Sequence, residues 1–255
     1  MAHETLFDNG THRNILLEDV PSGGLAVQSN QHLIIDGSSG MILDPGGHKV
    51  YSKVLSATTS QLGRARLETI FLSHQDPDIV AAVNGWLMTT DATAYVSELW
   101  TRFVPHFGLD RLVEGRLLGI PDGGQKLRVG STEVLVLPAH FLHSPGNFHI
   151  YDPVSKILFS GDMGASLVDH DQAAQPVRDF DDHLLTMIGF HRRYMISNKI
   201  CRFWVNMVRQ LDVEMIVPQH GCRFEGKVMV NRFLDWIETL QCGIDLMTQS
   251  NYRAP

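Results

Sequence analysis

Six residues with metal-binding side chains recur at the ends of apolar stretches of this chain. Three are histidines and three are aspartates: His74, Asp76, Asp78, His143, Asp162 and His220. Imidazole nitrogen and carboxylate oxygen are both ligands for divalent transition metals. Each of the six follows or ends a run of apolar residues typical of a buried strand. Because α/β proteins gather functional side chains at strand ends, we expect the six to converge on a two-metal site.

The densest group is the segment 73–78, with the sequence SHQDPD, which follows the apolar stretch 67–72. Alternate side chains of an extended segment point to the same side, so His74, Asp76 and Asp78 would lie on one side and could bind the same metal site. Pro77 fixes its own φ and biases the preceding residue toward extended geometry. The alternative is a polar turn in which Asp78 caps the next helix, and this segment alone leaves both interpretations open.

Three later segments supply the remaining candidates. His143 lies in a Pro/Gly loop after one apolar stretch, whereas Asp162 and His220 each follow another such stretch. His140, three residues before His143, is an alternative ligand, but His143 is preferred because its position before Ser-Pro-Gly matches the loop pattern. His140 could then support the ligands from behind or simply be a histidine at a strand end. His149 lies within an alternating strand and is expected to be a structural histidine.

The elements that must position these residues form two successive strand-rich halves, each closed by helices. Apolar runs bounded by turn residues predict strands at 24–28, 32–36, 40–44, 67–73, 92–96, 127–129, 133–138, 148–152, 157–162 and 214–218. Apolar periodicity predicts helices at 49–62, 79–89, 97–107, 183–198, 200–211 and 226–248. This order predicts an α/β fold with two sheets packed face to face and helices outside, a four-layer αββα sandwich.

Composition narrows the class of protein. The chain has 255 residues, of which 44% are hydrophobic and 19% charged, which suits a single domain over residues 1–255. The net charge of -7 argues against a nucleic-acid or anionic-membrane partner. The N-terminus lacks the basic and apolar regions of a signal peptide, and no apolar run is long enough to span a membrane. Motifs of serine hydrolases and of nucleotide-phosphate binding are absent from the sequence.

The three cysteines, Cys201, Cys222 and Cys242, form no CxxC motif, and their odd number argues against a disulfide framework. We therefore expect reduced thiols and a cytoplasmic protein.

The order HxDxD followed by single H, D and H residues resembles the metallo-β-lactamase-fold superfamily, and within it the diiron domain of flavodiiron proteins. The segments LHSPGN, FSGDMG and VPQHG lie where that family has its ligands, and residues 192–198 also resemble its pattern. The resemblance covers essentially the whole chain, and it implies the αββα fold and a diiron centre. Carried over residue by residue, it gives one iron His74, Asp76, His143 and a bridging Asp162. The other iron would have Asp78, His220 and the same bridge.

Two positions depart from the patterns of these families. The usual superfamily motif is HxHxDH and the flavodiiron motif is HxExDH, so Asp76 is a shortened glutamate and Ile79 replaces the closing histidine. An added carboxylate favours iron over zinc. The second iron would then keep an open position. The single-domain oxygen-binding diiron proteins of bacterial chemotaxis, which the chain also resembles, lead one to expect the same feature.

These features predict a non-haem diiron protein that binds dioxygen. An oxygen sensor in signalling or chemotaxis is favoured over an enzyme, although slow oxidoreductase activity is possible. No flavodoxin or rubredoxin domain and no bound flavin are expected. One alternative is an oxygen or nitric oxide reductase domain supplied with electrons by separate redox partners. Another is a dizinc hydrolase with a bridging hydroxide. A homodimer and a signalling or redox partner protein are expected from the resemblance. Tyr194 could donate a hydrogen bond near bound dioxygen, or it could serve packing at an interface.

Overall fold

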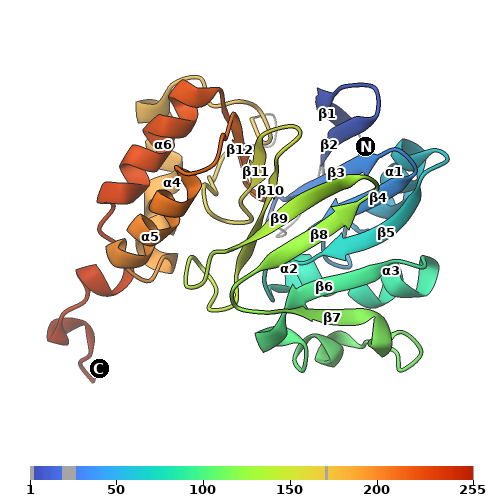
Figure 1. Cartoon of the computed structure of the whole chain (residues 1–255). Coiled ribbons are helices and arrows are strands. Elements are labelled where there is room, and N and C mark those ends of the chain that lie inside the picture. Colours follow the sequence, from blue (N-terminus) through green and yellow to red (C-terminus); the bar gives the residue numbers. More distant parts are fainter. Residues whose placement is uncertain (1–2, 19–26, 170–171, 255) are drawn as a thin grey trace.

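The computed structural model describes residues 3–18, 27–169 and 172–254 (Figure 1). Its strands are β1 His3–Asp8, β2 His12–Glu18, β3 Asn30–Asp36, β4 Ser39–Leu43, β5 Arg66–Phe71, β6 Thr93–Ser97, β7 Leu117–Ile120, β8 Gln125–Val129, β9 Thr132–Pro138, β10 Phe148–Asp152, β11 Ile157–Phe159, β12 Met215–Val217 and β13 Phe224–Glu225. The α-helices are α1 Tyr51–Leu62, α2 Pro77–Val80, α3 Val83–Thr89, α4 Phe180–Tyr194, α5 Asn198–Val208 and α6 Lys227–Thr239.

The first sheet contains β1 to β7 in chain order. Its first four strands pair antiparallel, and β4 to β7 pair parallel. Parallel strands need crossover connections, and α1 and α3 lie in two of them. Val54 of α1 and Trp86 of α3 are fully buried with Ile42 and Ile70 of the sheet. The helices therefore cover one apolar face of this sheet.

The second sheet has the order β13-β12-β11-β10-β9-β8. Only β11 and β12 pair parallel, and the crossover between them contains α4 and α5. Trp204 of α5 and Phe233 of α6 are buried against Leu158 and Ile216 of the sheet. The helices α4, α5 and α6 gather on one side of the molecule, with α1 and α3 on the other (Figure 1).

A third apolar cluster lies between the two sheets. It joins Ile34, Met41 and Phe71 of the first sheet to Val136 and Ile150 of the second. Sheets with apolar residues on both faces must be covered on both faces. The predicted four-layer αββα sandwich is therefore confirmed.

Several elements differ from the sequence prediction. The hairpin β1–β2 was not predicted, although its Asn9-Gly10 turn is a strong hairpin signal. The predicted helix 79–89 is divided into α2 and α3, because the chain turns between them. The predicted helix at 97–107 consists of two 3-10 turns, η1 Glu98–Trp100 and η2 Val104–Phe107.

The strands β7 and β13 were also missed; both are short. The predicted helix 226–248 ends at Thr239, because Leu240 takes extended geometry (φ -63°, ψ 122°). The 3-10 turns η4 Gly243–Leu246 and η5 Gln249–Asn251 follow it. Of the predicted strand 24–28, residues 24–26 lie outside the described residues, and 27–28 are irregular. Within the described ranges, no helix has both the length and the apolar character needed to cross a membrane.

Candidate metal centre

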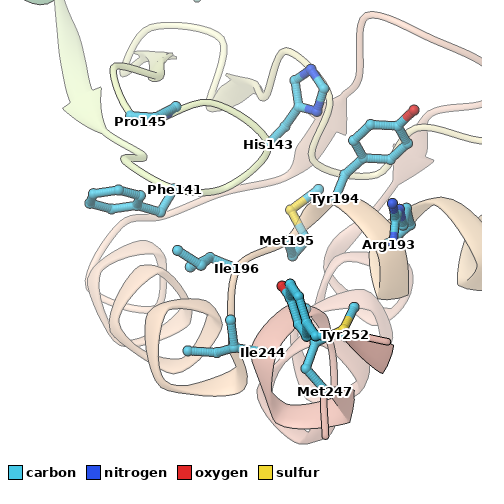
Figure 2. Close-up of a pocket in the computed structure, with 11 residues that line it drawn as sticks. Phe141, His143, Pro145, Arg193, Tyr194, Met195, Ile196, Ile244, Met247 and Tyr252 are labelled. Carbon is cyan, nitrogen blue, oxygen red and sulfur yellow. The ribbon is translucent and has the colours of Figure 1, made fainter. Parts of the chain in front are cut away.

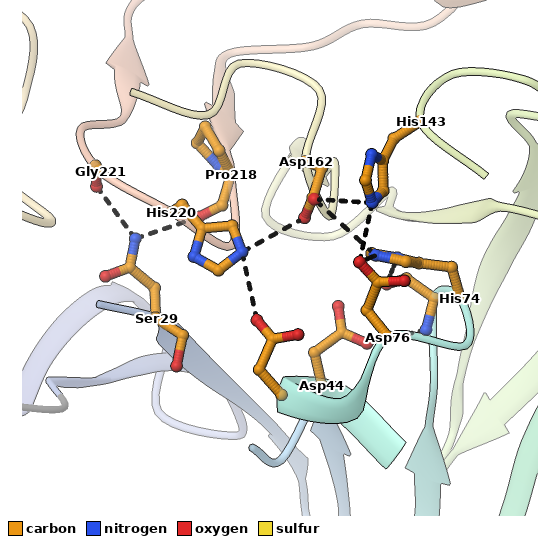
Figure 3. Close-up of polar contacts among 12 residues, drawn as sticks. Ser29, Asp44, His74, Asp76, His143, Asp162, Pro218, His220 and Gly221 are labelled. Carbon is orange, nitrogen blue, oxygen red and sulfur yellow. Dashed lines mark hydrogen bonds and ion pairs between the residues drawn. The ribbon is translucent and has the colours of Figure 1, made fainter. Parts of the chain in front are cut away.

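The structure brings all six predicted ligands to one edge of the sandwich (Figure 3). His74 follows β5, while Asp76 and Asp78 lie at the start of α2. The remaining three come from the second sheet, in the segments after β9, β11 and β12: His143, Asp162 and His220. Because the two sheets contribute three side chains each, the site joins the two halves of the molecule.

Asp162 lies at the centre of the group. Its Oδ2 is 3.8 Å from His74 Nε2 and 3.6 Å from His143 Nε2, whereas its Oδ1 is 3.6 Å from His220 Nε2. Oδ1 is buried and has no hydrogen-bond partner among the described residues. A buried carboxylate oxygen without a donor is costly unless a cation compensates it. The two oxygens face different histidine groups, as a bridging carboxylate would.

The first group consists of His74, Asp76, His143 and the Oδ2 of Asp162. Asp76 Oδ2 lies 2.9 Å from His143 Nε2 and 3.7 Å from His74 Nε2. One ligand atom from each of these three residues lies within 4.8 Å of the others. Donors and acceptors at this spacing around a common centre suit a transition-metal ion.

Asp76 is aimed into the site by its neighbours. It is the N-cap residue of α2 by its backbone, yet its side chain accepts no capping hydrogen bond. Instead Gln75 Nε2 donates to Asp76 Oδ1 at 2.9 Å, and Ser144 Oγ donates to Gln75 Oε1 at 2.5 Å. This leaves Oδ2 facing the two histidines. The alternative in which Asp78 caps the next helix is wrong, because Asp78 lies inside the first turn of α2 and the N-cap position belongs to Asp76.

The second group is smaller. Asp78 Oδ2 lies 3.4 Å from His220 Nε2, and Asp162 Oδ1 completes it. Ile79, at the position of the closing histidine, is fully buried in the core between α-helices and the first sheet. The side chain of Asp78 is 39% exposed. Among the described residues the second group therefore offers three candidate ligands and lies nearer to solvent.

In two of the three histidines, His74 and His220, the Nδ1 atom is engaged by a neighbour and Nε2 faces the ligand group. His220 Nδ1 donates to the carbonyl of Gln28 at 2.5 Å, and His74 Nδ1 lies 2.9 Å from Ser73 Oγ. A carbonyl can only accept, so the proton of His220 lies on Nδ1 and its Nε2 can ligate. Ser73 is itself fixed, because its backbone N–H donates to Asp44 Oδ1 at 2.7 Å.

The β3 end of the first sheet holds the His220 loop, and the sequence did not predict this. Asn30 Nδ2 donates to the carbonyls of Pro218 and Gly221, at 3.1 and 3.0 Å. Gln28 Oε1 accepts the N–H of Gly221 at 3.0 Å. These partners are separated by about 190 residues of sequence, so no local pattern reveals them. We call Gln28 and Asn30 the β3 clamp.

Asp44 is a further residue that the sequence analysis did not single out as part of the site. It is buried, has a positive φ of 45° and lies beside the ligand group (Figure 3). Burial raises its pKa to about 6, although the N–H of Ser73 opposes this. Asp44 ends the apolar run 40–44, so the rule that found Asp162 could have found it.

The charges of the site call for a cation. Burial alone would lower the pKa of His74, but the charge of Asp162 and the hydrogen bond with Asp76 raise it to about 9. Burial also raises the pKa of Asp78, against the opposing charge of His220. Without a metal, the carboxylates therefore draw protons onto this site. Divalent ions at the same positions would replace those protons, so the residues present fit two metal ions.

The loop of His143 is held in an uncommon backbone conformation. His143 and Phe141 have positive φ values of 77° and 65°, which cost energy for residues other than glycine. Asn147 Nδ2 donates to the Leu142 carbonyl at 2.6 Å, and the N–H of Ile196 donates to the Phe141 carbonyl at 3.2 Å. Strain maintained by such contacts is typical of functional loops.

Tyr194 packs on His143 with ring centroids 5.1 Å apart, and Phe190 lies 5.7 Å from the same ring. Tyr194 is 51% exposed. Its ring thus supports a ligand, and the predicted hydrogen bond from its hydroxyl to dioxygen stays a prediction.

An open pocket of about 280 Å³ adjoins His143 and Tyr194 (Figure 2). Its walls are mostly apolar and come from the His143 loop, the end of α4 and the C-terminal segment: Phe141, Pro145, Met195, Ile196, Ile244, Met247 and Tyr252. The pocket meets the metal site only at His143, whose ring lines both.

The two other histidines considered from sequence lie elsewhere. His140 Nε2 donates to the Asp122 carbonyl at 2.8 Å, and its ring packs on Phe148. His149 Nδ1 accepts from Trp204 Nε1 at 3.0 Å, and burial lowers its pKa to about 3. Both are thus engaged away from the six ligands.

Comparison with known proteins agrees with this geometry. The model of the family described as "ODP family beta lactamase" matches residues 27–221, well over half of the chain. The chain belongs to the ODP family. A solved structure described as the peroxy diiron species of the chemotaxis sensor ODP is 39% identical, with a TM-score of 0.85, and covers 99% of this chain and 100% of its own. The apo state of the ODP chemotaxis sensor from T. denticola is also 39% identical, with a TM-score of 0.83 over 98% of this chain and 99% of that one.

Two further matches are more distant, and the first of them shows the fold alone. A flavodiiron protein variant from Thermotoga maritima is 15% identical with a TM-score of 0.74, covering 93% of this chain and 60% of its own. An uncharacterized protein of Methanocaldococcus jannaschii is 21% identical over 216 residues, which is 81% of this chain. This chain spans about half the length of that relative (52%). The resemblance to metallo-β-lactamase-fold diiron proteins is thus confirmed.

Proposed function

We propose that this chain binds two iron ions and, through them, dioxygen, and that it serves as an oxygen sensor in signalling. The observation that carries the proposal is the orientation of the Asp162 carboxylate, whose two oxygens face two separate histidine–carboxylate groups. Three histidines and three aspartates supply harder donors than an imidazole-rich zinc site. The similarity to the ODP chemotaxis sensors, one described as a peroxy diiron species, supports the same assignment.

The residues of the chain have distinct parts in this proposal. One iron would be held by His74, Asp76 and His143 and the other by Asp78 and His220, with Asp162 shared. Ferrous iron, when bound, would supply the electrons that oxygen binding requires. Ile79 offers no donor to the second position, so that position keeps room for an added ligand. The β3 clamp and the Gln75–Ser144 pair would hold the metal-binding side chains in place while dioxygen binds and leaves.

The test begins with metal-free protein loaded with ferrous ion under anaerobic conditions. We expect two irons per chain by metal analysis, and a long-lived visible absorption after exposure to oxygen. Preferential uptake of zinc at both positions, with hydrolysis of generic thioesters or phosphodiesters, would overturn the iron assignment. Rapid bleaching with continuous oxygen consumption on added reductant would instead make the chain a reductase that depends on outside electron donors.

The partners and the compartment are part of the same proposal. A sensor acts by altering the activity of a partner, so we propose that a signalling protein binds this chain and responds to its oxygen-bound state. We also propose that the chain forms a homodimer. The three free cysteines suit the reducing cytoplasm, where we place the protein. Sedimentation of the iron-loaded chain, with and without oxygen, tests the dimer, and cell fractionation tests the compartment.

A further inference from the structure

Two of the three cysteines lie next to each other in the core of the helical layer. Cys201 on α5 and Cys242, just after α6, have sulfur atoms 3.8 Å apart, and both side chains are fully buried. A disulfide needs sulfurs about 2 Å apart, so a small side-chain adjustment brings the pair to bonding distance. We propose that Cys201 and Cys242 form a redox-active dithiol that peroxide converts to a disulfide. This site is separate from the metal centre and does not rest on the proposed function.

The chain around Cys242 provides a way for an oxidant to reach it. The residues on either side of it are partly or fully exposed, and residues 244–251 are all exposed. The segment is held mainly by Asp245, whose carboxylate accepts the backbone N–H of Asn198 at 2.6 Å, and by the N–H of Ile244, which donates to the Ile196 carbonyl at 2.8 Å. Short segments with few buried contacts open locally more easily than a helix core does. Opening of this segment would uncover Cys242 while α5 keeps Cys201 in place.

The chemistry of the two thiols differs in the required direction. The hydrogen bond between the two sulfurs lowers the pKa of Cys242, although burial opposes this, whereas the same bond and burial raise the pKa of Cys201. The thiolate is the form that attacks peroxide. Cys242 would therefore react first, and Cys201 would resolve the product.

The reaction balances with hydrogen peroxide as the oxidant. The Cys242 sulfur attacks one peroxide oxygen, the O–O bond breaks, and hydroxide leaves with the thiol proton as water. The Cys201 sulfur then attacks the sulfenic sulfur, the S–O bond breaks, and a second water leaves with the proton of Cys201. Two thiols and one peroxide give one disulfide and two waters, with two electrons passing from sulfur to oxygen.

The bond would fix the C-terminal segment to α5. Ile244 and Met247 of this segment line the pocket beside His143, and Ile196 lies between that wall and the His143 loop. The disulfide would close a loop of 41 residues, and cross-links over long loops restrict the unfolded chain strongly. Oxidation should therefore raise the melting temperature and slow hydrogen exchange in residues 240–247.

Cys222 is the matched control for the experiment. It is also buried, but its thiol donates to the Gln172 carbonyl at 3.2 Å, and burial raises its pKa to about 11. The full chain is treated with hydrogen peroxide, its remaining thiols are alkylated in denaturant, and its peptides are mapped by mass spectrometry. We expect the wild-type chain and Cys222→Ser to lose two thiols and to yield a peptide joining Cys201 to Cys242. Cys201→Ala and Cys242→Ala should form no intramolecular disulfide.

The peptide map of the wild-type chain decides the matter even where a variant fails to fold. Retention of all three thiols, bonds that include Cys222, or separate oxidation of Cys201 and Cys242 to sulfonic acids would each overturn the proposal. A dithiothreitol wash should restore both thiols and return the melting temperature of the oxidised chain to that of the untreated chain. A melting temperature that does not respond to oxidation would show that the C-terminal segment is not fixed as proposed.

Discussion

At the scale of single residues, Asp162 is the only described side chain within reach of histidines from both ligand groups. Replacing it by alanine removes a shared ligand and leaves His74, His143 and His220 without their common carboxylate. We predict that Asp162→Ala lowers bound iron from two ions per chain to less than one. Metal analysis after anaerobic loading measures this. Asp91→Ala is the control, because Asp91 is an exposed aspartate that should leave the iron content unchanged. Retention of both ions in Asp162→Ala would contradict a bridging role.

The histidines that the Asp76 carboxylate contacts, His74 and His143, both belong to the first group. We predict that Asp76→Ala weakens one metal position and leaves the other intact, so about one iron remains per chain. Affinity at the damaged position should fall by at least tenfold, about 1.4 kcal/mol, because a charged ligand is lost. Asp76→Glu, which restores the flavodiiron residue, should recover the second ion. Titration with ferrous ion measures all three proteins, and loss of both ions from Asp76→Ala would show that the two positions are not separable.

The convergence of the six candidate ligands could be predicted from sequence because each belongs to a recognisable local pattern, a polar residue within a few positions of the end of an apolar strand. Gln28 and Asn30 could not be predicted in this way. Their partners in the His220 loop are about 190 residues away, and neither amide lies in a motif. Asp44 lies between these cases, because it ends an apolar strand but supports Ser73 and is not itself grouped with the histidines.

At the scale of elements, the β3 clamp connects the start of β3 to the loop after β12. Asn30→Ala removes the donor to the carbonyls of Pro218 and Gly221, and both acceptors are buried. Unpaired buried groups cost about 1–3 kcal/mol, so we predict a loss of unfolding free energy in that range. The ion at the Asp78–His220 position should also bind more weakly. Denaturant unfolding and ferrous titration measure the two effects.

Asn231→Ala is the matched control for the clamp, because Asn231 is exposed on α6. It should change neither stability nor iron content. If Asn30→Ala lost stability but kept full affinity at both metal positions, the clamp would stabilise the fold without positioning His220.

The same scale shows why the order of elements could be predicted and some boundaries could not. Strands β3, β4 and β10 are buried at every position, and β3 and β4 contain unbroken apolar runs at 33–35 and 41–43 that mark them in the sequence. The hairpin strand β1 is an edge strand with a mixed burial pattern, so its apolar signal is weak. The helix expected over 226–248 stops at Thr239 although its sequence contains no proline, because the chain turns there toward α5.

At the scale of the whole molecule, a second polar cluster joins the two sheets through buried charges. His12 Nε2 lies 2.7 Å from Asp152 Oδ2, and its Nδ1 lies 3.3 Å from Asp36 Oδ1. Burial opposes protonation of His12, but the hydrogen bonds and charges of both aspartates raise its pKa above the usual value. A raised pKa in the folded state means that this contribution is complete below pH about 6.5. It is lost as the pH rises through the folded value.

We therefore predict that the unfolding free energy of the metal-free chain falls as the pH rises from 6 toward the raised pKa of His12. His12→Gln should be less stable at pH 6 by about 3 kcal/mol, because removal of one partner breaks a buried pair. Its stability should fall less steeply with pH than that of the wild type, since the raised pKa of His74 contributes to the fall in both proteins. Urea unfolding across the pH range measures both proteins. His48→Gln, at an exposed histidine, should follow the wild-type curve. Parallel curves for wild type and His12→Gln would rule out this pair as the cause.

Metal binding should act on the same whole-molecule stability, because the ligands come from both sheets. An unfolded chain cannot keep His74 of the first sheet near His143 and His220 of the second, so a bound ion favours the folded state alone. We predict that ferrous ion at about 100 times its Kd adds about 2.7 kcal/mol per independent position, and that a chelator reverses this. Asp162→Ala should show a much smaller response. Since His74 has a pKa raised to about 9 in the metal-free protein, uptake must displace a proton. At one fixed ferrous concentration the stabilisation should therefore grow between pH 6 and 8, and a response that is flat over this range would place the ions away from His74.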